Sequence, residues 1–306
     1  MSFSQISNGD TGLQARTQLN NLINFAYALT HEPHTAYCSE SLGNDATAAL
    51  GNPSLPYATA NAAYAALSAL SGTGLRLHVI DGNVGNIVLT SGMSKPLMVT
   101  GNGAHCVIQG ILAAGANGGT GGEAEPGGAG TAGFVVDLIS DGSVSINTLT
   151  TDGGGGGDGG DGGFDSAATN GGAGNTSGSL RLRGILRCGA ITARGGNGGT
   201  GNAYGGAGGT GGDVGLVLVD GLVFCESFSA SAGTGGGSAG GGSSGSNGNG
   251  PGVIAGCFIR GLRSSGSIYM TGAGGGAIIV DSFGTSLDSG SGVAVACYTH
   301  GSLPSW

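Results

Sequence analysis

The chain has 306 residues, of which 72 are glycine and 7 are proline, and its 18 acidic and 9 basic residues give a formal net charge of −9. Proline this scarce excludes collagen, and a hydrophobic content of 39% with only 9% charged residues argues against a disordered chain. Nucleic acid is an unfavourable partner, because phosphate binding needs clustered lysine and arginine.

Residues 1–42 predict a small helical region for attachment or docking. Apolar residues from Leu19 to Leu29 recur at helical spacing and form one stripe. This stripe fits either a helix packed on its own domain or one that docks on another subunit. The first residues lack the features of a signal peptide, and no apolar run is long enough to span a membrane. We therefore expect synthesis in a cytoplasm and no membrane insertion.

Residues 43–110 predict the helix-capped start of a β-solenoid. Thr59 is expected to cap a helix that reaches about Leu70, and a first strand is expected over residues 75–80. The Gly43-Asn44-Asp45 loop and the Pro56-Tyr57-Ala58-Thr59 turn resemble the opening of right-handed parallel β-helix proteins, many of which are phage tailspikes and polysaccharide lyases.

Residues 111–276 predict repeated units, and residues 277–306 predict strands that cap the C-terminal end. Apolar strand residues recur about every 40 positions, which is typical of a solenoid. They are Ile111, Leu149, Ile191, Phe228 and Ile268. The fold class that follows is all-β, a β-solenoid of the right-handed parallel β-helix type.

Alignment of these units makes two further predictions. Cys188 falls on Cys225, and both are expected to be free thiols, because the six cysteines are far apart in the sequence. A ladder of alternating charge is expected along one face, with Asp141, Arg183, Asp220 and Arg260 at equivalent positions.

Glycine tracts between Gly115 and Pro251 separate the predicted strands, and in most of them glycine recurs with a period of three. A polyproline II-type helix has three residues per turn, so a Gly-Gly-X repeat leaves two of its faces without side chains. We predict a stacked bundle of polyglycine II helices in which each tract runs out and back. The interrupting turns then meet at one end and form a receptor-binding patch of Glu123, Glu125, Phe164, Asp165, Tyr204 and Asn247.

No cofactor and no metal are expected. Asp158, Asp161 and Asp165 partly match a calcium-binding repeat, which leaves calcium open as an alternative. Catalysis is not expected, because acids on the predicted strands are few and scattered, whereas enzymes that cleave glycans pair their carboxylates.

Glycine helices joined by variable turns resemble the tip adhesins of T-even-like phage long tail fibres, on the residues Asp152–Gly163 and Gly195–Asp213. The resemblance implies a virion protein whose N-terminal region binds other virion proteins and whose turns bind a host surface protein or glycan. Two alternatives stay open. One is a capsid-decorating or tail-assembly protein without receptor binding, and the other is a β-helix glycan lyase or hydrolase.

Overall fold

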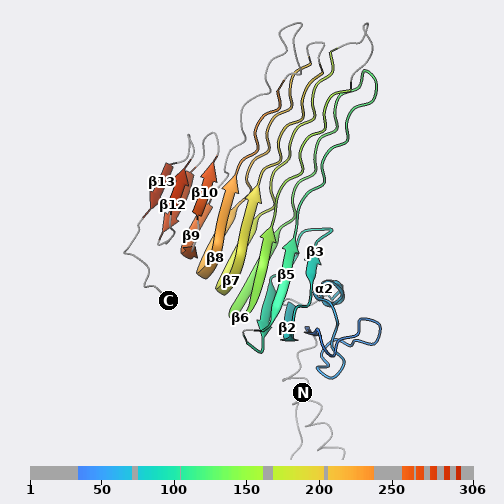
Figure 1. Cartoon of the computed structure of the whole chain (residues 1–306), viewed down its shortest axis with the longest axis vertical. Coiled ribbons are helices and arrows are strands. Elements are labelled where there is room, and N and C mark those ends of the chain that lie inside the picture. The colour runs from blue at the N-terminus through green and yellow to red at the C-terminus, as the bar shows by residue number, and fades with distance from the viewer. Residues whose placement is uncertain are drawn as a thin grey trace, which may run out of the picture.

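The computed structural model is mostly β, with parallel strands stacked as a β-solenoid, and its described residues include one short helix (Figure 1). This confirms the predicted solenoid. The structure describes residues 34–70, 75–103, 105–160, 168–202, 206–237, 257–264, 267–271, 276–280, 286–289 and 294–297. The predicted helix around Leu19–Leu29 lies outside these residues.

The strands fall into two strips, and every described pairing between strands is parallel. The first strip contains β1 (Thr35–Ser39), β2 (Leu75–Asp81), β4 (Leu97–Gly101), β9 (Cys257–Ser264), β11 (Gly276–Val280) and β13 (Ala294–Cys297). The second contains β3 (Asn86–Val88), β5 (Val107–Leu112), β10 (Ser267–Thr271) and β12 (Ser286–Ser289). Three long strands bend and belong to both strips, namely β6 (Val136–Thr150), β7 (Leu180–Arg194) and β8 (Val217–Ser231).

The predicted ladder of apolar residues forms the core of the second strip. Ile111 pairs with Leu149, Leu149 with Ile191, Ile191 with Phe228, and Phe228 with Ile268. All five side chains are buried. Because each unit buries its apolar residue against the next unit, the spacing of about 40 residues becomes a continuous core.

The predicted capped helix and the strand after it are present near the start of the solenoid, but strand β1 precedes both. Helix α2 (Ala60–Ser68) starts after Thr59, whose side chain accepts a hydrogen bond from the Ala62 amide. The Asp45 carboxylate accepts hydrogen bonds from the Thr59 amide and hydroxyl and from the Ala58 amide. The loop therefore fixes the cap. Strand β1 already pairs with β2, so regular pairing begins before residue 43, and the division at 42 and 43 stays a prediction.

The predicted charge ladder is correct for Arg183, Asp220 and Arg260 and wrong for Asp141. Arg183 pairs with Asp220 and Asp220 with Arg260. Between β6 and β7, however, the register shifts after Asp141, so Arg183 lies beside Ile139. Its guanidinium instead forms an ion pair with Asp137, with 2.5 Å between the nitrogen and the oxygen. The shift is a bulge near Gly142, which has a positive φ of 85°.

The glycine tracts leave the strand ends as extended segments that are neither helix nor strand (Figure 1). We call them passes, and we call the assembly the glycine slab. The outgoing passes are 113–122, 151–160, 195–202 and 232–237, and the described returning passes are 126–135, 168–179 and 206–216. Outgoing passes bond to outgoing passes and returning to returning, and further bonds connect the two layers.

Hydrogen bonds in the slab recur every third residue. In pass 151–160, the amide of Gly153 donates to the carbonyl at the end of β7, and the amides of Gly156 and Gly159 donate to the next outgoing pass, at 2.7–2.8 Å. The amides one residue later, of Gly154 and Gly157, donate to the returning pass 126–135, and that of Gly160 donates to the first turn just before this pass. Two of every three amides are therefore satisfied by backbone carbonyls of different neighbours.

The third amide of each triplet faces outward, and an Asn or Asp side chain of the preceding unit often binds it. Asn117 Oδ1 accepts from the Gly155 amide, and Asp158 Oδ1 accepts from the Thr200 amide, at 2.8 and 2.7 Å. Asn197 and Asn170 do the same for Thr234 and Ala207 in later units. Outward Asn and Asp residues thus complete the hydrogen bonding of the slab.

Candidate functional site at the turns of the glycine slab

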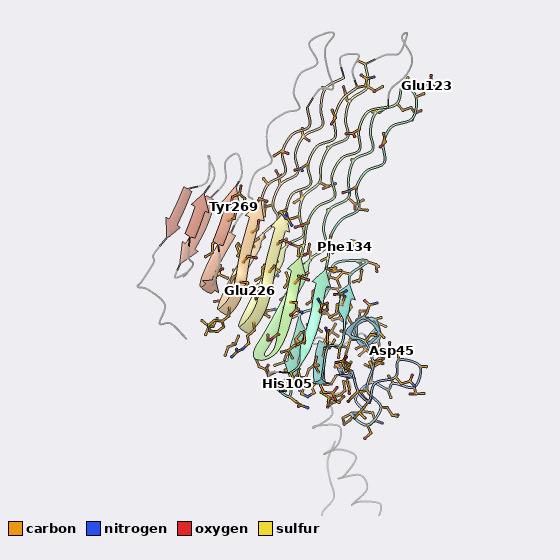
Figure 2. All side chains as sticks on the ribbon, in the orientation of Figure 1. Asp45, His105, Glu123, Phe134, Glu226 and Tyr269 are labelled. Carbon is orange, nitrogen blue, oxygen red and sulfur yellow. The ribbon has the colours of Figure 1, made fainter. Side chains whose placement is uncertain are left out.

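The first turn of the slab exposes two carboxylates. Glu123 and Glu125 both lie on the surface, and Figure 2 shows Glu123 at the end of the slab far from the solenoid. The Glu125 amide donates to the Gly122 carbonyl at 3.0 Å, and Ala124 between the acids has a φ of 60°. Gly160 donates to the Glu125 carbonyl at 2.9 Å, so the first turn contacts the end of the second outgoing pass.

Two buried polar residues connect the second and third turns. Thr169 and Asn202 are 4% and 2% exposed and bond to each other twice through backbone and side chain, at 3.0 and 3.1 Å. The Thr169 hydroxyl also donates to the Gly160 carbonyl at 2.8 Å, and Gly206 donates to Asn202 Oδ1 at 3.3 Å. This network ties together the bases of the first three turns, from Glu125 through Gly160 to Gly206.

The structure thus places two of the six predicted binding residues. Glu123 and Glu125 lie at the expected end, whereas Phe164, Asp165, Tyr204 and Asn247 lie outside the described residues. Sequence reasoning missed the roles of Thr169 and Asn202. They stand inside the segments that interrupt the glycine period, where the only available signal is a hydrogen-bonding side chain next to glycine.

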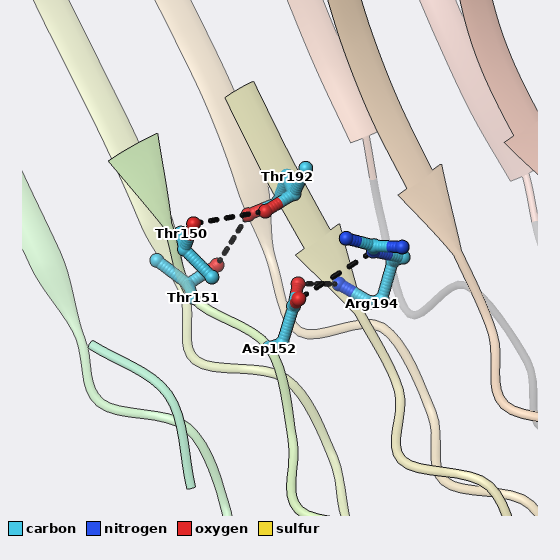
Figure 3. A network of polar contacts seen from close by, with 5 residues as sticks. All are labelled: Thr150, Thr151, Asp152, Thr192 and Arg194. Carbon is cyan, nitrogen blue, oxygen red and sulfur yellow. Dashed lines mark hydrogen bonds and ion pairs between the residues drawn. The ribbon is translucent and has the colours of Figure 1, made fainter. Parts of the chain in front are cut away.

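A polar network occupies the junction between the strands and the slab (Figure 3). Thr192 bonds through its hydroxyl to the Thr150 hydroxyl at 3.2 Å, and its carbonyl accepts from the Thr151 amide at 2.9 Å. Asp152 and Arg194 follow two residues after Thr150 and Thr192. Asp152 Oδ1 accepts from the Arg194 amide at 2.9 Å, and Asp152 Oδ2 lies 3.4 Å from Arg194 Nε. The junction is therefore held by side chains as well as by backbone.

Within the described part of the chain, no group of three or more His, Cys, Asp or Glu residues is placed to hold a metal ion. Of the three acids in the calcium-binding alternative, Asp158 is described, and one of its oxygens is bound to the Thr200 amide. Asp161 and Asp165 lie outside the described residues. None of the described helices is both long and apolar enough to cross a membrane.

Four thiols, those of Cys38, Cys106, Cys188 and Cys225, are buried and unpaired. Cys188 pairs with Cys225 on the neighbouring strand, as predicted, and Cys38 and Cys106 are also free. Burial raises the pKa of Cys38 to about 12 and that of Cys225 to about 11, and burial also raises the pKa of Cys188. These thiols are therefore neutral core side chains and not nucleophiles.

Comparison with known proteins assigns no relative to this chain. The sequence matches no protein-family model, and no curated protein and no solved structure shows significant similarity to it. The fold is thus established by the structure alone, as a β-solenoid with a hydrogen-bonded glycine slab.

Proposed function

We propose that this protein is a phage virion protein, a tail fibre or spike adhesin, and that the turns of the glycine slab bind a receptor on the host cell. The observation that carries the proposal is the network of Gly160, Thr169 and Asn202, which holds the bases of successive turns together at the exposed end. Variable loops on a rigid scaffold are suited to recognition, because little conformational entropy is lost on binding.

This proposal also explains why the scaffold beneath the turns is rigid. We take the passes to be polyglycine II helices that are packed against one another. Support comes from the period of three in their hydrogen bonds and from the different neighbours that successive amides reach. Amide hydrogen exchange by NMR tests this assignment. Gly153, Gly154, Gly156 and Gly157 are expected to be strongly protected, and fast exchange throughout pass 151–160 would show that the slab does not form in solution.

The proposal also assigns the partners of the protein and the roles of the turn residues. The N-terminal region binds other virion proteins, the ligand is a host surface protein or glycan, and the chain carries out no catalysis. Glu123 and Glu125 supply negative charge at the first turn, and Phe164 and Tyr204 supply aromatic anchors of the kind that dominate binding surfaces.

The experiment measures binding of the labelled full-length protein to intact bacterial cells from a panel of strains. The variants Phe164→Ala and Tyr204→Ala are expected to lose most of the binding shown by the unaltered protein. Phe224→Ala is the matched control, because Phe224 is an exposed aromatic residue on β8 of the solenoid, 40% exposed. It is expected to bind as the unaltered protein does.

Other outcomes separate the alternatives. Unchanged binding in both turn variants would reject the adhesin and favour a capsid-decorating or tail-assembly protein. Release of reducing sugars from capsular polysaccharide would instead identify a glycan lyase or hydrolase.

A further inference from the structure

A shallow depression lies on the outward face of the slab, next to the end of β7 and apart from the turns. Its volume is about 420 Å³, and its walls include Asn117, Asp152, Arg194 and Asn197. The backbone of the glycine passes forms the floor, on which Gly155 occupies an outward position. The corresponding outward positions before and after it in the same pass carry Asp152 and Asp158.

Packing does not require glycine at position 155. A β-carbon there would lie 3.4 Å from the Asn197 carbonyl oxygen and 3.5 Å from Asn117 Oδ1, which are ordinary contacts. At the inward-facing Gly154 and Gly157, the same atom would lie 1.9 and 2.0 Å from a carbonyl oxygen. The missing side chain at position 155 therefore leaves an opening that the slab itself does not need.

The walls of this opening present hydrogen-bond donors. The Oδ1 atoms of Asn117 and Asn197 already accept from backbone amides, so the NH₂ groups are the polar groups that these two wall residues have left to offer a ligand. Both oxygens of Asp152 are engaged by Arg194, through its amide and its Nε. The side chain of Arg194 is 53% exposed, and its two terminal NH₂ groups remain for a ligand (Figure 3).

We propose that this depression binds the carboxylate of an acidic sugar. A guanidinium matches a planar carboxylate with two parallel hydrogen bonds. The amides of Asn117 and Asn197 then donate to oxygens of the sugar ring, and the glycine floor admits the ring without a clash. This site is separate from the turns, so the proposal does not rest on the proposed function.

The test is a calorimetric titration of the full-length protein with trigalacturonate. Arg194→Gln is expected to weaken binding by about tenfold or more, because it removes a charge-assisted hydrogen-bond pair. Gly155→Asn is expected to abolish binding by filling the depression. The matched controls are Arg181→Gln, which removes an exposed arginine of β7 outside the depression, and Gly119→Asn, at a glycine of the first pass with no described atom within 4 Å of an added β-carbon. Both controls are expected to bind within about twofold of the unaltered protein.

Two further ligands complete the experiment. The methyl ester of trigalacturonate is expected not to bind, and inorganic phosphate is expected to compete only weakly. The proposal is overturned if trigalacturonate does not bind, if its ester binds equally well, or if Arg194→Gln has no effect. Tighter binding of phosphate than of trigalacturonate would also overturn it, by assigning the site to phosphate. None of these results bears on the cell-binding assay, which tests the turns.

Discussion

At the scale of the residue, the passes that lie beside a glycine decide whether a side chain is tolerated there; Gly119 has the triplet position of Gly157, but it lies in the first pass, which has no earlier outgoing pass beside it. Gly118 and Gly119 are neighbours in the first outgoing pass with opposite surroundings. A β-carbon on Gly118 would lie 1.9 Å from the Gly128 carbonyl oxygen, whereas none of the surrounding atoms lies within 4 Å of one on Gly119. Sequence alone indicates that the period is three, but it does not tell which glycines face a neighbour.

This difference predicts opposite effects of two adjacent alanine substitutions. Gly118→Ala is expected to lower the free energy of unfolding by about 1–3 kcal/mol, since the slab must separate locally to admit the methyl group. Gly119→Ala is expected to be neutral or to stabilise by up to about 1 kcal/mol, because alanine restricts the unfolded chain. Denaturant unfolding of the two variants measures both effects, and equal destabilisation would contradict the assignment of the two faces.

The buried thiols predict a loss of stability at alkaline pH. The pKa values of Cys38 and Cys225 are raised from 9.0 to about 12 and about 11, so these thiols ionise more easily in the unfolded chain. Their stabilising contribution is complete below pH 9 and is lost as the pH rises through 11 and 12. The free energy of unfolding, measured at intervals across this pH range, is expected to decrease steadily as the pH rises.

A thiol titration provides the control for that prediction. All six cysteines are expected to react in denaturant without reductant, and Cys38, Cys106, Cys188 and Cys225 are expected to be protected in the native protein at pH 8. A count below six in denaturant would reveal a disulfide and contradict the assignment of free thiols.

At the scale of the element, the long strands show how much the sequence predicts. The apolar ladder from Ile111 to Ile268 is aligned residue for residue, because each member must be buried against the next. The bulge that displaces Asp141 could not be predicted, since it depends on the local fit of one bend and leaves the burial pattern unchanged. Half-buried charged residues constrain register weakly, so the charge ladder was the less reliable guide.

Two phenylalanines of β8 predict contrasting contributions to stability. Phe228 is 1% exposed between Ile191 and Ile268, and Phe224 on the same strand is 40% exposed. Phe228→Ala is expected to cost about 3–5 kcal/mol through lost burial and the cavity left behind. Phe224→Ala is expected to change stability by about 0.5 kcal/mol or less. Thermal unfolding of both variants tests the apolar ladder. A similar loss of stability in the two variants would show that the core does not lie along it.

At the scale of the whole molecule, the slab and the solenoid share one set of units. Each long strand runs directly into a pass, and the passes keep the order of the strands from which they leave (Figure 1). The sequence predicted this arrangement, including the out-and-back course of the first three tracts, whereas the meeting of all the turns stays a prediction. It did not predict that outward Asn and Asp residues would bind backbone amides of the next unit, because that requires knowledge of which passes are neighbours.

This architecture predicts that insertions into a pass are tolerated only in multiples of three. Insertion of one glycine after Gly155 moves the amides of Gly156, Gly157, Gly159 and Gly160 away from their acceptors, at about 1 kcal/mol for each lost bond. Insertion of Gly-Gly-Asp at the same place restores the phase and lengthens the end of the pass. The single insertion is therefore expected to lower the midpoint of denaturant unfolding far more than the triple one, and the reverse order would exclude a three-residue period.

The direction in which Asn and Asp side chains reach has an evolutionary consequence. Asn117 serves the unit after it, and Asp158 and Asn197 serve the units after theirs. Each of these three units therefore offers its successor a side-chain acceptor, although the triplet that carries it differs between units. Because the backbone bonds between passes do not depend on side chains, a duplicated unit inserted between two others would find backbone partners on both sides. Such a gene can lengthen or shorten by whole units through recombination, and each product keeps the backbone bonds between passes.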